Sequence, residues 1–294
     1  MDTINELYEH FPVLYYTYIF IVGLLVGSFL NVVVYRLPVM MERAFKREYL
    51  EWFTPDCEEL KKEEAKFNLM VPRSRCPKCG HAITAWENIP VISWLFLRGK
   101  CSGCGLPISF RYPAVELLTA VLTLCCGFMF APSLAFFGAI FFTWALIALS
   151  FIDFDKMLLP DEITLPLVWA GCFLNIWGSY CSLQDSVIGA IAGYGFLWAF
   201  CGLFKLVTGK EGMGAGDFKL MAAIGSWFGW QMLPAAIIGS AFAGAVIGGT
   251  YLAINRSGSK PIPFGPYIAV AGLAVMYFGH NINAWYIQSV LMGK

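Results

Sequence analysis

Two acidic positions in this sequence stand where apolar segments meet polar loops. Asp153 ends a long apolar run, and Asp217 follows the glycine-rich stretch 212–216 just before another such run. A carboxyl group near lipid is costly and tends to face a protein-lined, hydrated cavity. Like charges about 3 Å apart cannot both ionise, so two such groups brought together would share one proton. One ionised and one protonated carboxyl group can activate water and polarise a carbonyl, which is the chemistry of peptide hydrolysis.

A neighbouring aspartate, Asp155, competes with Asp153 for this role. Residues two apart lie on opposite sides of a helix, so only one of the two can point at Asp217. Asp153 is nearer the apolar run, whereas Asp155 is next to Lys156. We therefore expect Asp153 to be buried and catalytic, and Asp155 to be solvated. The glycines before Asp217 permit backbone conformations closed to other residues. They could let an extended substrate lie close to the main chain, let a helix start be reshaped, or only make a flexible loop, and a Gly-x-Gly-Asp string alone is a weak signal.

Four cysteines form two Cys-x-x-Cys pairs in a polar stretch of the chain. They are Cys76, Cys79, Cys101 and Cys104, with 21 residues between the pairs and a glycine directly after each pair. Paired thiolates on two tight turns suit a closed tetrahedral zinc site, which leaves no position open for substrate. The pattern predicts a structural Zn²⁺ ion in a reducing compartment.

Composition identifies the surroundings of these sites. The chain has 294 residues, of which 58% are apolar and 14% charged, whereas a soluble domain carries roughly a quarter charged residues. Of the 20 Lys and Arg residues, 13 lie between Arg36 and Arg111. Acidic residues balance this basic loop, so nothing indicates a nucleic-acid partner. The chain is predicted to be a multi-pass membrane protein in contact with lipid.

Apolar runs set the number of spans. Residues 11–35 form one span, while 117–152 and 220–255 each hold 36 uncharged residues, too many for one span of about 20. Proline-containing breaks near 131–133 and 231–234 divide each of these runs into two. Three further apolar segments bring the prediction to about eight transmembrane helices. Every Lys and Arg except the terminal one then falls on one side, which the positive-inside rule makes cytoplasmic. Both aspartates fall on that side as well.

The predicted fold is therefore all-α and polytopic, with three parts. Residues 1–37 hold the first span, 38–112 a cytoplasmic zinc-ribbon-like loop domain, and 113–294 a seven-helix core. Within the loop, 48–66 is rich in Glu and Lys and predicts a solvated helix. Asp161, directly after a proline and before an apolar segment, is typical of a helix N-cap.

Two other features each have two interpretations. The small-residue stretch from Gly27 to Asn31 could be a contact between helices, or it could bind substrate or cofactor. Glu116 could be an acidic residue favoured by the macrodipole at a helix N-terminus, or it could be functional.

Taken together, these motifs resemble the bifunctional type IV prepilin leader peptidase and N-methyltransferase family over nearly the whole chain. The residues that carry the resemblance are Gly27-Ser28-Phe29-Leu30-Asn31, the paired cysteines, Trp86-Glu87-Asn88-Ile89-Pro90, Arg111-Tyr112-Pro113, Leu159-Pro160-Asp161, Gly212-Met213-Gly214-Ala215-Gly216-Asp217 and Pro261-Ile262-Pro263-Phe264-Gly265-Pro266.

The resemblance implies that aspartates matching Asp153 and Asp217 cleave a short basic leader after a glycine, at the cytoplasmic face of the bacterial inner membrane. It implies prepilins and type II secretion pseudopilins as substrates, and methylation of the new N-terminal residue, usually Phe, from S-adenosylmethionine. The methyl donor is expected at the first span and zinc loop, with Gly27, Ser28, Asn31 and Glu116 as candidates. Two alternatives remain, a presenilin-like protease with other substrates and a non-enzymatic zinc-loop scaffold for assembly or transport.

Overall fold

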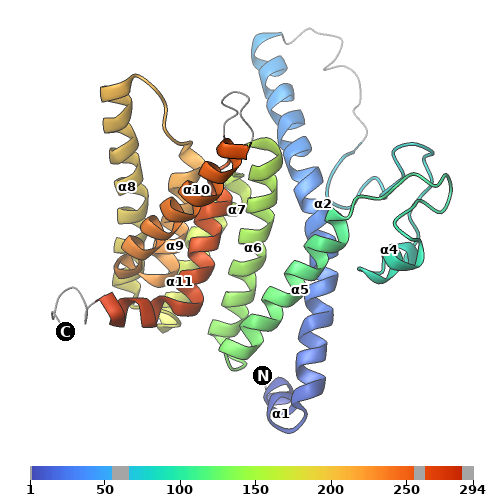
Figure 1. Ribbon diagram of the computed structural model, residues 1–294, viewed down its shortest axis with the longest axis horizontal. Coiled ribbons are helices and arrows are strands. Elements are labelled where there is room, and N and C mark those ends of the chain that lie inside the picture. The colour runs from blue at the N-terminus through green and yellow to red at the C-terminus, as the bar shows by residue number, and fades with distance from the viewer. Residues whose placement is uncertain (1, 55–65, 255–261, 287–294) are drawn as a thin grey trace. The chain divides into compact units, whose positions relative to one another are not determined.

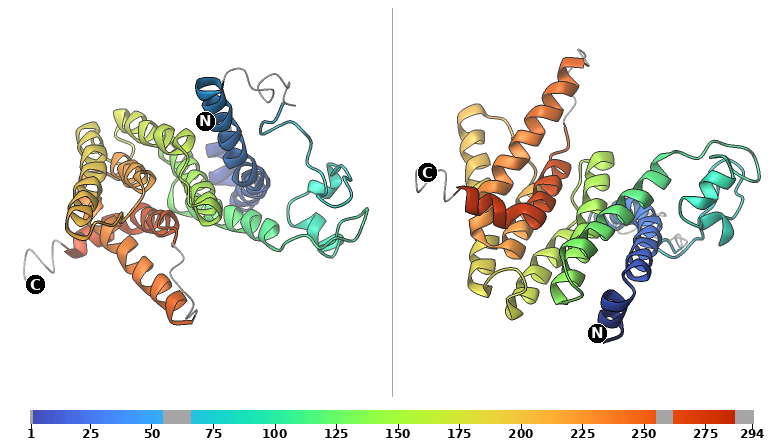
Figure 2. Two further views of the ribbon diagram at one scale, coloured as in Figure 1. Left: turned by 90° about the horizontal axis from the view of Figure 1, so that it is seen from above. Right: turned by 60° about the horizontal axis from the view of Figure 1, so that its bottom comes forward.

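The computed structural model describes residues 2–54, 66–254 and 262–286 (Figures 1 and 2). These residues form helices and no β-strand; two isolated bridges, Arg75 with Ala82 and Lys100 with Pro107, are the only β-type pairing within the described ranges. The chain divides into an N-terminal unit, residues 2–125, and a C-terminal unit, residues 126–294. The all-α prediction is confirmed for the described part of the chain.

The N-terminal unit contains two long helices that lie side by side (Figure 1). Glycines permit their close approach, because a Cβ on Gly23 or Gly27 would lie only 2.6 Å from the Cα of Ala120 or Glu116. The elements of this unit are α1 (Asp2–His10), α2 (Pro12–Phe53), η1 (Trp86–Asn88), α4 (Ile92–Phe96) and α5 (Arg111–Met129), the last of which crosses the boundary between the units.

Helix α2 continues well beyond the first apolar run. The sequence predicted a polar loop from residue 38, but the helix runs on to Phe53 and includes Pro38. Residues 39–53 are mostly Met, Glu, Arg, Ala, Lys and Leu, which are strong helix formers, and this explains the extension. The predicted solvated helix over 48–66 is helical as far as Phe53; residues 55–65 lie outside the described residues.

The C-terminal unit is built around a short buried helix, α9 (Ala215–Phe228), which packs against α7, α8 and α11. Nearly every residue from Asp217 to Trp227 on α9 is buried. The other elements are α6 (Leu134–Lys156), α7 (Asp161–Leu174), η2 (Asn175–Trp177), α8 (Leu183–Thr208), η3 (Trp230–Met232), α10 (Leu233–Ile254) and α11 (Gly265–Tyr286).

The crossing of α8 and α9 is too close for any side chain larger than hydrogen. A Cβ on Gly189 would lie 2.2 Å from the carbonyl oxygen of Gly225, and a Cβ on Gly225 would lie 2.1 Å from that of Gly189. One helical turn farther along α8, Gly193 meets the backbone of Met221 in the same way. Small residues allow such contacts between membrane helices. The contact fixes α9, and with it the helix start that carries Asp217.

Five helices among the described residues are long and apolar enough to cross a membrane. Both predicted breaks are confirmed: α5 ends at Met129 and Ser133 caps α6 by accepting a hydrogen bond from the backbone N–H of Phe136, while η3 separates α9 from α10. Helices α7 and α9, at 14 residues each, are shorter than the roughly 20 residues that a span requires. The multi-pass membrane architecture is confirmed, and the number of eight spans stays a prediction.

Candidate active site

Asp217 lies in the first turn of α9, where its carboxyl group closes the helix start. The backbone N–H of Gly214, the N-cap residue, donates to Asp217 Oδ2 at 3.2 Å. This is the carboxylate half of a capping box; glycine has no side chain to supply the other half. Asp217 is 8% exposed. The carboxyl group of Asp217 is therefore buried, and a backbone hydrogen bond holds it in one orientation.

Asp153 is held in a similar way at the end of α6. The backbone N–H of Gly265, the first residue of α11, donates to Asp153 Oδ2 at 2.9 Å. Asp153 is 5% exposed, whereas Asp155, two residues on, is exposed. The two aspartates thus differ in burial as the sequence predicted.

Leu159 lies between the two carboxyl-bearing segments. A Cβ on Gly216 would lie 2.8 Å from Leu159 Cβ, and a Cβ on Gly265 would lie 3.0 Å from Leu159 Cδ2 and 2.7 Å from Asp153 Oδ2. The carboxyl groups of Asp153 and Asp217 are near enough to interact electrostatically. Two acidic side chains from different helices are therefore brought to the same region of the C-terminal unit, and the single proton that they would share stays a prediction.

None of the glycines in the stretch 212–216 before Asp217 has the positive φ that is closed to other residues. Gly214 has an extended conformation, with φ −79° and ψ 155°, and the positive-φ glycines among the described residues all lie elsewhere in the chain. Gly216 is required for a different reason, since a side chain there would collide with Leu159. Close packing, and not an unusual backbone conformation, accounts for Gly216.

Asp161 is not the N-cap of α7, as its sequence context predicted. Pro160 occupies that position, and Asp161 is the first helical residue. Its carboxylate accepts two hydrogen bonds from Lys219 Nζ, at 2.6 and 2.7 Å. Lys219 lies two residues beyond Asp217, so this ion pair ties the start of α7 to the turn that carries Asp217. Lys219 was not singled out by sequence reasoning; Gly265 was, as part of the motif 261–266, but without its hydrogen bond to Asp153.

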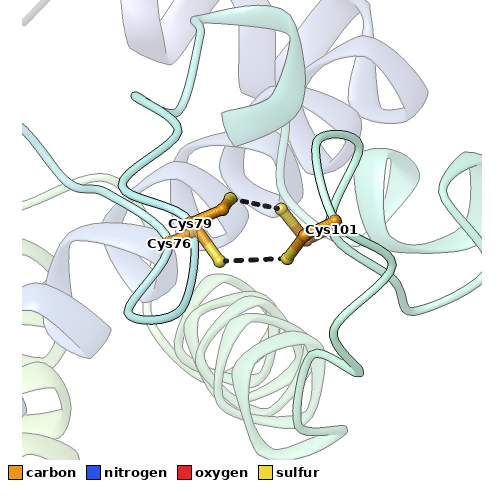
Figure 3. Close-up of side chains that lie close together, drawn as sticks. Cys76, Cys79 and Cys101 are labelled. Carbon is orange, nitrogen blue, oxygen red and sulfur yellow. Dashed lines mark hydrogen bonds between the residues drawn. The ribbon is translucent and has the colours of Figure 1, made fainter.

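The four cysteines converge as their spacing predicted (Figure 3). Their sulfur atoms lie within 4.8 Å of one another, with Cys76 Sγ 3.8 Å from Cys104 Sγ and Cys79 Sγ 3.9 Å from Cys101 Sγ. A tetrahedral zinc ion with Zn–S bonds of about 2.3 Å requires sulfur separations of about 3.8 Å. The cluster therefore has the dimensions of a Cys₄ zinc site.

Backbone groups around the cluster favour metal binding. Gly80 and Gly105, which follow the two pairs, each have φ +71°, a conformation that other residues rarely adopt. The backbone N–H groups of Cys79 and Lys78 donate toward the Cys76 sulfur and lower the pKa of that thiol to about 6. A lowered pKa favours the thiolate, the form that binds metal, at Cys76. At Cys79, despite a hydrogen bond from the His81 backbone N–H, burial and the neighbouring cysteine thiols raise the pKa to about 11.

Glu87 joins the two cysteine turns. It accepts hydrogen bonds from the Ser102 hydroxyl, the Thr84 backbone N–H at 2.8 Å and His81 Nε2 at 3.1 Å. These bonds, with that of Ser102 first, lower the pKa of Glu87 to about 2. His81 follows the first cysteine pair and Ser102 lies within the second, so this ionised carboxylate holds both turns together. The sequence analysis named Glu87 within the motif 86–90 but did not predict that it joins the two cysteine turns.

The residues expected at the methyl-donor site meet where α2 contacts α5. Gly27 packs on the backbone of Glu116, Ser28 hydrogen bonds to the Glu116 carboxyl group, and Asn31 Nδ2 donates to the Tyr112 carbonyl at 3.1 Å. Glu116 also accepts the backbone N–H of Val91 at 2.7 Å. Each residue thus has a packing or hydrogen-bonding role within the N-terminal unit. Their role in binding a methyl donor stays a prediction.

Two family models match the sequence. The model described as the bacterial Peptidase A24 N-terminal domain matches residues 21–130, and that of the type IV leader peptidase family matches residues 140–249. The first contains the cysteine cluster and the second contains both aspartates.

Relatives match over nearly the full length of the chain. Proteins named prepilin leader peptidase/N-methyltransferase are 53% identical in Aeromonas hydrophila, over 99% of this chain and 100% of the relative, and 47% identical in Pseudomonas aeruginosa, over 98% of each. The relative of the same name in Dichelobacter nodosus is 51% identical over 90% of this chain and 93% of its own length. No solved structure gives a significant match. With both family models in order and about half of all residues shared end to end, the chain belongs to the type IV prepilin leader peptidase/N-methyltransferase family.

Proposed function

We propose that this chain cleaves the leader peptides of type IV prepilins and type II secretion pseudopilins, with Asp153 and Asp217 as its catalytic pair. The observation that carries the proposal is the placement of two buried carboxyl groups at one site, each oriented by a backbone N–H group from a helix start. The relatives that share about half of its residues are named for this activity. The names of these relatives do not favour the two alternatives, a presenilin-like protease with other substrates and a non-enzymatic scaffold.

The chemistry follows from one shared proton. The ionised carboxylate of the pair takes a proton from a water molecule, whose oxygen attacks the carbonyl carbon of the scissile peptide bond. The protonated carboxyl group donates to the carbonyl oxygen as negative charge develops there. The C–N bond then breaks, the amine leaves with a proton, and the pair again holds one proton. The N–H groups of Gly214 and Gly265 keep the two carboxyl groups in the orientation that this exchange requires.

The reaction takes place at the cytoplasmic face of the bacterial inner membrane. Support comes from the distribution of charge, since 13 of the 20 Lys and Arg residues lie between Arg36 and Arg111, directly after the first span. With the predicted spans, Asp153 and Asp217 lie on the same side as these residues.

The second activity is methylation of the new N-terminal residue of the cleaved substrate. S-adenosylmethionine supplies an electrophilic methyl group when it is bound. Of the four candidates, Glu116 carries a buried carboxyl group at the contact of α2 with α5, and the half-buried Ser28 hydrogen bonds to it. Gly27 has no room for ligand atoms because Glu116 packs against it. In this step Ser28 and Glu116 would orient polar groups toward the methyl donor. The zinc site would keep the loop that contains the four cysteines folded.

Loss of a zinc ligand is expected to unfold the loop. Cys76→Ser should lose bound zinc and lower the amount of protein in the membrane, because binding free energy at a structural zinc site is folding free energy. Cys125→Ser is the matched control, since Cys125 lies on α5 outside the cluster. For both variants, mass spectrometry measures the zinc content, and the amount of protein in the membrane is measured alongside it. Zinc content and abundance equal to the wild type in Cys76→Ser would rule out the structural site.

The proposed function is tested with the full-length protein in vesicles and a synthetic prepilin that carries a short basic leader, a glycine and a phenylalanine. We expect release of the leader with or without S-adenosylmethionine, and methylated product only with it. Mass spectrometry distinguishes the products. An active preparation of a relative serves as the positive control, and failure of this chain to cleave under the same conditions contradicts the proposal.

A further inference from the structure

Within the described ranges, the short helix α4 presents a face of large apolar side chains that are mostly exposed. Leu95 is 61% exposed and Phe96 is 85% exposed, and Ile92, one turn before Phe96, lies on the same face. Trp86, in the adjoining turn η1, is exposed as well. In water, such a cluster of large apolar side chains is unfavourable, and it marks a surface that contacts something apolar.

Three contacts fix where α4 lies along α5. Trp94 Nε1 donates to the Ile108 carbonyl at 3.1 Å, and its ring packs edge to face on Phe110, with the ring centroids 5.7 Å apart. The backbone N–H of Val91, the residue before α4, donates to the Glu116 carboxyl group at 2.7 Å. Ile108 and Phe110 immediately precede α5, while Glu116 lies about 8 Å along that helix from Arg111, at 1.5 Å per residue.

The connection to α4 is rigid on both sides. Val91 has φ +61° and Ile92 N–H donates to the Pro90 carbonyl, so Val91 is the centre of a γ-turn, which is a strained conformation for a β-branched residue. After the helix, Gly99, at φ +66°, packs against the Trp94 ring. The contacts of Trp94 and Val91 therefore hold α4 beside the start of α5, a helix that is long and apolar enough to cross a membrane.

Charge identifies the partner of this face. Residues 69–111 contain six Lys or Arg and a single acidic residue, Glu87, whose carboxylate is engaged by Ser102 and His81. Two of the basic residues, Arg98 and Lys100, follow α4 directly and are exposed. An apolar helix face flanked by basic residues, at the level where a span begins, is the pattern of a segment that lies in the interface of an anionic membrane.

We propose that α4 is an interfacial anchor, with Ile92, Leu95 and Phe96 inserted among lipid acyl chains and Arg98 and Lys100 against anionic headgroups. The anchor would hold the zinc loop flat against the membrane surface from which a prepilin emerges. It depends on the membrane location of the chain and not on which reaction the chain catalyses.

The test places a photo-reactive side chain at position 96. Full-length protein with p-benzoylphenylalanine in place of Phe96 is inserted in nanodiscs of phosphatidylethanolamine and phosphatidylglycerol, irradiated and analysed by mass spectrometry. Position 121 on α5, where Val121 is 44% exposed, gives the lipid-contact reference, and position 78, where Lys78 is exposed on the first cysteine turn, gives the solvent reference. Position 95 provides a second probe if the first variant is poorly produced.

We expect lipid adducts at position 96 as abundant as at position 121, and few at position 78. Phosphatidylglycerol should be enriched among these adducts by about fivefold for each basic residue in contact, and Arg98→Gln with Lys100→Gln should remove the enrichment. Adducts at 96 no more frequent than at 78 would overturn the proposal. The proposal would also be overturned if position 96 formed adducts mainly with protein. The protein could be another part of this chain or a prepilin added to the nanodiscs. Equal labelling of both lipids would overturn the headgroup contact.

Discussion

Asp217→Asn is expected to reduce the rate of leader cleavage by about 10²–10⁴-fold, to the background of the assay, because it removes one member of an acid–base pair. Asparagine has nearly the same shape, and its side-chain oxygen can still accept the N–H of Gly214. The start of α9 should therefore keep its structure while the site loses its shared proton. Initial rates on a synthetic prepilin in vesicles measure the effect.

The matched control for this substitution is Asp161→Asn. Asp161 accepts its hydrogen bonds from Lys219, which lies two residues beyond Asp217 on α9. The Asp161 side chain is 52% exposed, and asparagine at this position can still accept a hydrogen bond from Lys219 Nζ. We expect Asp161→Asn to keep the rate within a few-fold of wild type. Thermal melting establishes that both variants are folded. Cleavage by Asp217→Asn at more than a tenth of the wild-type rate is incompatible with a two-aspartate mechanism.

Gly265→Ala is expected to impair cleavage almost as severely without removing any ionisable group. The added Cβ would lie 2.7 Å from Asp153 Oδ2 and 3.0 Å from Leu159 Cδ2, so the carboxyl group of Asp153 must move. Misplacement of a catalytic group by about 1 Å can cost roughly 10²-fold in rate. The loss should appear in kcat, with KM nearly unchanged, because the substitution displaces a group that acts on the reacting bond.

Gly239→Ala controls for the loss of a glycine in a membrane helix. Its added Cβ would meet Ala271 Cβ at 3.5 Å, an ordinary van der Waals contact, so its rate should equal that of wild type. A wild-type rate for Gly265→Ala would show that the position of Asp153 does not depend on the start of α11. A large rise in KM with kcat unchanged would place Gly265 at the substrate-binding surface instead.

Local signals in the sequence were sufficient for several features of this structure. The break at 131–133 joins a proline to Ser133, a typical N-cap residue, in a run too long for one span, and this combination predicted where α6 begins. The cysteine spacing predicted a cluster because each pair forms its own turn. The sequence also predicted that Asp153 is buried and Asp155 is not, because Asp153 is closer to the apolar run. The residues of that run form the buried part of α6.

Features that depend on tertiary contact were not predictable. Gly265 and Asp153 are 112 positions apart, and no local pattern indicates that one donates a hydrogen bond to the other. Gly216 looked like a source of backbone freedom, although its neighbour Leu159 is what excludes a side chain. The anchoring of Val91 by Glu116 likewise joins two segments whose separation in sequence hides their contact.

The central claim, that Asp153 and Asp217 form the catalytic pair, is tested most directly by comparing Asp153→Asn with Asp155→Asn in one reconstituted cleavage assay. The two substitutions are chemically identical and lie two positions apart on α6, but only Asp153 is buried and bound by Gly265. We predict no measurable cleavage by Asp153→Asn and nearly full activity for Asp155→Asn, with both proteins present at wild-type levels. Near-normal cleavage by Asp153→Asn, or an inactive Asp155→Asn, would contradict this account of the site.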